Sequence, residues 1–161
     1  MVERGCWIVN TFFTWKPVFE LIMAFFGSMG YAVLFHLRKK LMFVASMGGV
    51  LTWLVYLICV IFMPGVFFPS FIAASIGAFY AEIMARIIKT PSTPFFVVAM
   101  IPLIPGSTLY YTMNQVVHGN LTIASIYGVR TLQCAIGIGA GMSLAWALCD
   151  LSRKIEAYRK K

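Results

Sequence analysis

The sequence of 161 residues has little charge: 11% of its residues are charged, and only five are acidic. A typical soluble domain has about 25% charged residues, which help to cover its apolar core with a surface that water solvates. Here 61% of the residues are hydrophobic, so the charged side chains cannot cover the rest. This shortage excludes an ordinary soluble domain, and we expect most of the outer surface to face lipid.

Residue types that bind metals or catalyse reactions are also scarce. The four cysteines show no paired spacing, and neither His36 nor His118 has a second ligand one helical turn away. Three of the cysteines fall within or at the ends of apolar stretches, where we expect buried packing thiols. No nucleophile stands beside a base in a recognisable pattern. We therefore expect no metal site, no cofactor and no enzyme activity, with a membrane enzyme that uses an embedded carboxylate as a minor alternative.

Long uncharged stretches dominate the sequence instead. No Asp, Glu, Lys or Arg occurs at 41–81, 90–129 or 131–149. About 20 apolar residues cross a membrane, and turn-forming residues at 63–65 and 114–120 divide the first two stretches. The pattern predicts an all-α, polytopic integral membrane protein, a bundle of five transmembrane helices in a single domain. The expected spans are about 17–37, 41–63, 69–88, 93–113 and 129–149, followed by a basic C-terminal tail at 150–161.

The positions of the cations favour this odd number of spans. Ten of the thirteen Lys and Arg residues lie after the first span, beside the third and fourth spans, and in the tail. Lys and Arg collect on the cytoplasmic side of membranes, so we expect the N-terminus outside and the C-terminus in the cytoplasm. In the alternative of four spans, with the first or second helix lying shallow, these clusters face opposite sides unless another segment re-enters. Short basic clusters beside spans suit anionic lipid headgroups, and we expect no nucleic-acid partner.

Glu82 is the acid that lies well inside a predicted span, and Arg86 follows it by one helical turn. An ionisable group inside a membrane costs at least about 2.5–3.5 kcal/mol, so it must pair or face water. One interpretation is a structural ion pair, with Arg86 reaching toward the interface. The other is a proton or cation carrier, with Glu82 as the coupling residue and Arg86 as its modulator. The sequence leaves both interpretations open.

The predicted fourth span contains two prolines and a glycine within five residues, which a straight helix does not accommodate. Unpaired backbone groups facing lipid are too costly, so this break must line a cavity or pack against protein. A half-helix that begins near the glycine directs N–H groups and a positive dipole end into the membrane, which suits an anionic ligand. The alternative is a proline kink whose backbone groups bond to neighbouring helices. The predicted substrate-binding residues are Pro102, Pro105, Gly106, Ser107, Thr108, Tyr110 and Tyr111.

Small residues recur every four positions in the third and fifth spans. Such rows let helix backbones approach closely in lipid. Packing within the chain and contact between subunits explain them equally well, so a homo-oligomer stays open. The rows are Ala73, Gly77, Ala81 and Ala85, and Ala135, Gly139, Ser143 and Ala147 with Gly137 and Gly141 beside them.

The residues around the break carry a family resemblance. Lys-Thr-Pro at 89–91, Ile-Pro-Leu-Ile-Pro-Gly at 101–106 and then Tyr110 resemble the signature of the threonine/serine exporter family. The preceding helix, with Ala-Glu-Ile-Met-Ala-Arg at 81–86, is similar to the helix before that signature. The match is specific over about 41–113. The chain resembles the small, stand-alone form of the C-terminal half of the fused exporters.

This resemblance implies export of small amino acids or related carboxylates from a bacterial cytoplasm, across the inner membrane and driven by the proton motive force. It also implies a partner, because fused members carry a larger membrane half that precedes this one. The expected function is therefore that of one subunit of a secondary-active exporter. The alternative is a non-transporting scaffold subunit that stabilises the larger partner.

Overall fold

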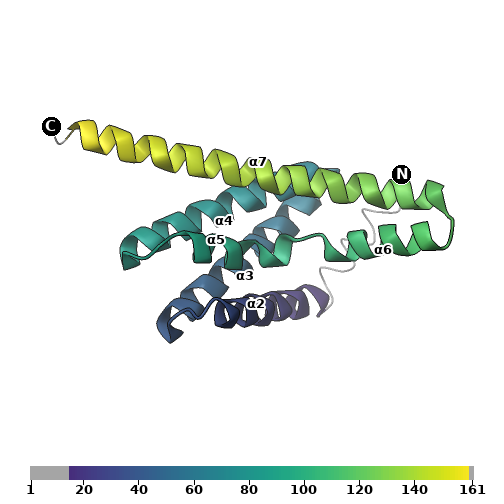
Figure 1. Cartoon of the computed structure of the whole chain (residues 1–161), viewed down its shortest axis with the longest axis horizontal. Helices are drawn as coiled ribbons and strands as arrows, with labels where there is room; N and C mark the ends of the chain where they lie inside the picture. Colours follow the sequence, from purple (N-terminus) through teal and green to yellow (C-terminus); the bar gives the residue numbers. More distant parts are fainter. Residues whose placement is uncertain (1–14, 160–161) are drawn as a thin grey trace.

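The computed structural model describes residues 15–159, and all regular secondary structure in this part of the chain is helical. The all-α fold class predicted from the sequence is confirmed. The last two residues of the expected basic tail lie outside the described residues. The helices are α2 (Lys16–Leu34), α3 (Lys39–Phe62), α4 (Phe67–Ile88), α5 (Thr93–Met100), the short 3-10 helix η1 (Ile101–Leu103), α6 (Gly106–Val117) and α7 (Leu121–Arg159), as Figure 1 shows.

Four helices in the described part of the chain are long and apolar enough to cross a membrane, namely α2, α3, α4 and α7. A fifth crossing is present if the bent pair Thr93–Leu103 and Gly106–Val117 is one span. The two parts of this pair meet at an angle of 55°, so the predicted break in the fourth helix is confirmed. The chain is a polytopic membrane protein with one broken helix.

Two helix boundaries near the break differ from the expectation. Asn114 and Gln115 were expected in a loop, but both lie in α6, and Gln115 Oε1 accepts a hydrogen bond from Asn120 Nδ2 at 3.2 Å. The turn itself is short because Gly119 adopts a φ of +76°, which reverses the chain within three residues. Beyond it, α7 begins at Leu121, eight residues before the expected start, because no proline interrupts it.

Helix α4 is the centre of the fold and packs against α3, α5 and α7. The row of small residues predicted on this helix is buried within the chain: Ala73 and Ala81 have no exposed surface, and Ala85 is 3% exposed. In lipid, no hydrophobic effect draws helices together, so close van der Waals contact between small residues is what holds them. The other buried residues of α4 are Pro69, Ser70, Ala74, Gly77, Ala78 and Glu82.

Helices α4 and α7 lie side by side and run in the same direction (Figure 1). Their contacts advance along both helices together, from Ser70 against Cys134 to Ser75 against the carbonyl of Gly141. A Cβ atom at Gly141 would lie 2.5 Å from the carbonyl oxygen of Phe71, so only glycine permits this approach. Gly137 and Gly141 therefore lie in the surface of α7 that contacts α4.

The second row of small residues faces outward. Ala135, Gly139, Ser143 and Ala147 are exposed, and a Cβ atom at Gly139 would meet nothing within 4 Å. Helix α7 packs instead through residues half a turn away, because helix positions two residues apart lie on different faces.

We predict that Gly141→Val lowers the free energy of unfolding by about 1–3 kcal/mol, because the added side chain overpacks the α4 contact. Gly139→Val is the matched control, since it adds the same side chain to the same helix in open space. Thermal unfolding followed by circular dichroism in detergent micelles measures both. Equal melting temperatures for the two variants would contradict the packing of α7 on α4 at Gly141.

Candidate functional site

Glu82 lies on the buried face of α4 and is 1% exposed. It stands in line with Ala78 and Ala74, one and two helical turns earlier, and both are fully buried. One turn later, Arg86 Nε donates to Glu82 Oε1 at 3.1 Å, so the predicted pair is formed. The Arg86 side chain is 40% exposed and that of Glu82 only 2%, so the guanidinium reaches from the buried acid toward the outside.

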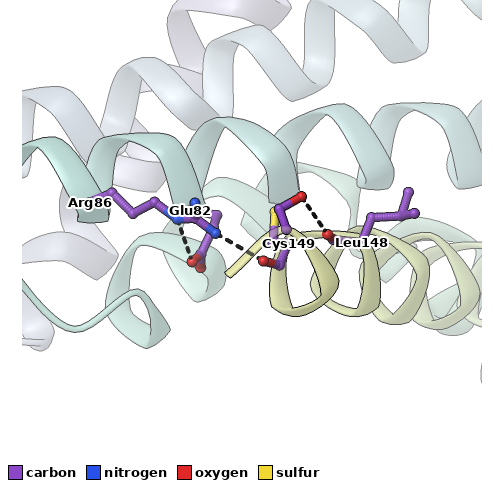
Figure 2. A network of polar contacts seen from close by, with 5 residues as sticks. Glu82, Arg86, Leu148 and Cys149 are labelled. Atoms are coloured by element: carbon purple, nitrogen blue, oxygen red, sulfur yellow. Dashed lines mark hydrogen bonds and ion pairs between the residues drawn. The ribbon is translucent and has the colours of Figure 1, made fainter. Parts of the chain in front are cut away.

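The guanidinium of Arg86 has a second partner, on a different helix. Its Nη2 donates to the backbone carbonyl of Cys149 on α7 at 3.0 Å (Figure 2). The hydroxyl of Ser152 donates to the carbonyl of Leu148 on the adjoining turn of α7. Arg86 therefore links the buried carboxylate of α4 to the backbone of α7. No sequence signal identifies this contact, because a backbone carbonyl is present at every position.

The break is built from the end of α5, the turn of η1 and the start of α6. Pro102 is the middle residue of η1 and Pro105 is the N-cap of α6. Neither proline has an N–H, so neither continues the hydrogen bonds of the preceding helix. The N–H of Ile104 donates to the carbonyl of Ile101 at 3.3 Å, and the N–H of Gly106 donates to Ile104 at 2.8 Å. The N–H of Gly106 is therefore used by the turn itself, although the half-helix begins at this residue as expected.

The N–H groups that remain at the start of α6 belong to Ser107 and Thr108. No carbonyl of the described residues accepts from either, whereas the N–H of Leu109 already donates to Pro105. The hydroxyl of Thr108 also turns back to the Pro105 carbonyl, at 3.1 Å. The anion-binding groups predicted from the sequence thus reduce to two backbone N–H groups and the hydroxyl of Ser107.

The two tyrosines of the predicted site lie on the outer surface of this chain. Tyr110 is 66% exposed and Tyr111 is 48% exposed, and their rings meet edge to face. Tyr111 also contacts Tyr127 of α7, with 5.6 Å between the ring centroids. Helix α6 has no buried residue and packs chiefly on α7, beside which it lies in Figure 1. This side of the candidate site is open within the single chain.

The structure does not bring the buried acid and the break together. Leu103 of η1 packs in a cluster with Ala73 and Ala74 of α4. Glu82 lies eight residues further along α4 than Ala74, or about 12 Å at 1.5 Å per residue. The candidate site therefore has two parts, an ion pair and a helix break, joined through α4 and its neighbours.

One residue at the break was missed by sequence reasoning. Ser28 of α2 is fully buried and lies against Gly49 of α3, close to Pro102 of the break. Its signal in the sequence is weak, a single hydroxyl in a long apolar segment. Among the described residues, no group of three or more His, Cys, Asp or Glu side chains is placed to hold a metal ion.

The sequence of the chain matches a known protein family. A family model described as threonine/serine exporter, ThrE, matches residues 20–148, a segment that contains both the ion pair and the break. The chain belongs to the threonine/serine exporter family. Membership makes it a membrane transport protein of the amino-acid exporter type. No curated protein and no solved structure matches the chain.

We predict that Arg86→Ala lowers the free energy of unfolding by about 1–3 kcal/mol, because it removes two hydrogen bonds and leaves the buried carboxylate less compensated. The range is below that of a fully buried pair, since solvent partly screens Arg86. Lys154→Ala is the control: Lys154 forms an exposed pair with Asp150 at the same spacing and 3.1 Å, and we expect a loss below about 0.5 kcal/mol.

Denaturant unfolding in detergent measures both variants of this exporter-family chain. Adding Glu82→Gln to Arg86→Ala should recover part of the loss, because a neutral amide needs no cation. Equal effects of Arg86→Ala and Lys154→Ala would refute a stabilising role for the buried pair.

Proposed function

We propose that this chain is one subunit of a secondary-active exporter of small amino acids of the threonine/serine type, or of related carboxylates. The observation that supports this most directly is the carboxylate of Glu82, buried in a membrane-spanning helix and bonded to a cation that also contacts a second helix. Buried ionisable groups in membrane helices are costly and mark ion or proton pathways. We assign proton coupling to Glu82 and Arg86.

The coupling step follows from the contacts of Arg86. A proton on Glu82 removes the charge that holds the guanidinium, so the bond from Nε to Oε1 weakens. Because the same guanidinium donates to Cys149, this change alters the link between α4 and α7. Protonation would thereby shift the relative position of the two most closely packed helices. The proton motive force supplies the free energy for this cycle.

The substrate site in this proposal is the helix break. The N–H groups of Ser107 and Thr108, at the positive end of α6, would receive the carboxylate of the substrate. Pro102, Pro105 and Gly106 shape the turn, and Tyr110 and Tyr111 offer phenol groups within one turn of helix. Both tyrosines are exposed here, so a larger membrane subunit would complete the site. The charge distribution favours a cytoplasmic C-terminus and an outer N-terminus in a bacterial inner membrane.

A second candidate function is a scaffold that stabilises the larger subunit without contacting the substrate. Two observations favour it: α6 has no buried residue, and the row from Ala135 to Ala147 on α7 is exposed. Both surfaces are available to a partner. In either function the chain does no covalent chemistry.

We predict that Glu82→Gln abolishes efflux driven by a pH gradient while the complex with the larger subunit still forms, because glutamine keeps the shape and cannot carry a proton. Proteoliposomes that contain both subunits and labelled L-threonine measure the gradient-driven rate. Asp150→Gln is the control, since Asp150 lies in an exposed pair near the end of α7. Full gradient-driven efflux in Glu82→Gln would disprove the coupling role.

We predict that the variant Gly106→Leu distinguishes the exporter function from the scaffold function. A Cβ atom at Gly106 would meet nothing within 4 Å, so the chain should fold and the complex should form. A bulky side chain beside Ser107 should obstruct the substrate, and we expect efflux to fall at least about tenfold, as for the loss of a charge-assisted hydrogen bond. Co-purification and efflux are measured on the same sample. Intact complex with unaltered efflux would support the scaffold instead.

A further inference from the structure

The hydroxyl of Ser28 is buried without a hydrogen-bond partner among the described residues. Ser28 has no exposed surface, and its Oγ contacts neither an acceptor nor a donor at hydrogen-bonding distance. A buried hydroxyl without a partner is destabilising, and such groups are rare in folded proteins. The unpaired hydroxyl of Ser28 therefore needs an explanation.

The other three fully buried serine and threonine residues bond within their own helices, whereas Thr90, beyond the end of α4, also has a buried hydroxyl without a partner. Ser46 donates to the carbonyl of Met42, and Thr52 donates to that of Gly48, each at 2.8 Å. Ser70 donates in the same way to the carbonyl four residues earlier. This bond is available to any serine in a helix. Ser28 does not make it, so its hydroxyl points elsewhere.

That hydroxyl points to the place where α2, α3 and the helix break meet. A Cβ atom at Gly49 would overlap Ser28 Oγ and would lie 3.4 Å from Cγ of Pro102. Glycine at position 49 leaves the room that the hydroxyl occupies. Pro102 has no N–H to offer, so the nearest part of the break cannot donate to Ser28. The buried hydroxyl thus faces the inner side of the proposed substrate site.

We propose that Ser28 is a specificity-determining residue, whose hydroxyl hydrogen-bonds the side-chain hydroxyl of a bound serine or threonine. This inference rests on the proposed function. Gly49 and Ser28 are buried, and the neighbouring ring of Pro102, which is partly exposed, carries no charge. Burying the ammonium or carboxylate of an amino acid there is costly, whereas an uncharged hydroxyl that both donates and accepts matches Ser28.

The substrate reaches Ser28 only if η1 moves away from α2, because the hydroxyl is covered in this conformation. The prolines on both sides of Leu103 make this segment the hinge of the proposal, since neither proline has an N–H to donate to a preceding carbonyl. The exporter then selects a substrate with a hydroxyl group while that substrate is enclosed between α2, α3 and η1. A substrate without a hydroxyl would leave Ser28 unpaired, which disfavours its transport.

The test compares L-serine with L-alanine, which differ by the hydroxyl. Proteoliposomes with both subunits are loaded with either labelled amino acid, and initial efflux rates are measured under a pH gradient. We expect Ser28→Ala to lower the ratio of serine to alanine efflux by about 3–10-fold, the effect of one neutral hydrogen bond. Ser46→Ala is the control, because Ser46 is equally buried but already bonded to Met42, and its ratio should equal that of the wild type.

Ser28→Cys serves as a second variant, since it nearly keeps the volume and a weak donor, and its ratio should fall between those of Ser28→Ala and the wild type. If either folded Ser28 variant keeps the wild-type ratio of serine to alanine efflux, the inference is wrong and the proposed exporter function stands. The same holds if a variant loses both efflux rates equally, because the ratio is then unchanged. An absence of serine efflux by the wild-type complex overturns the proposed function and this inference with it.

Discussion

The structure depends on one constraint, that a polar group inside the hydrocarbon must find its partner within the protein. Glu82 meets this constraint through Arg86, and Arg86 meets it through the carbonyl of Cys149 on α7. The contact requires α4 and α7 to lie very close, which the glycines at 137 and 141 allow. The small residues and the buried charge therefore depend on each other, because close packing of α4 and α7 brings the guanidinium of Arg86 within reach of α7.

The same constraint explains the form of the helix break. Pro102 and Pro105 lack backbone N–H donors. In the tight turn between α5 and α6, the N–H groups of Ile104 and Gly106 donate to nearby carbonyls instead. Most of the break is thus satisfied locally, and what remains for a ligand is the first turn of α6. The acid lies about 12 Å along α4 from the level of the break, so in the proposed exporter protonation of Glu82 would act on the substrate through a movement of helices.

Much of the candidate site was predictable from the sequence because its signals are local. Pro102 and Pro105 interrupt a helix wherever they occur, and Glu82 and Arg86 meet because residues four apart share a helix face. The carbonyl of Cys149 and the hydroxyl of Ser28 were not predictable, since their roles come from helices far away in the chain. The end of α6 was missed because Asn114 and Gln115 resemble a loop, although a helix tolerates them.

The sequence by itself determined the membrane class, the family, the broken helix and the buried acid, because composition and short-range spacing act through local backbone chemistry. Only the tertiary structure decided which row of small residues packs and which stays outside. Gly137 and Gly141 contact α4, whereas Gly139, between them, faces away. The reason is geometric: rows on adjoining faces of one helix have equal spacing, and a neighbouring helix can cover only one of them.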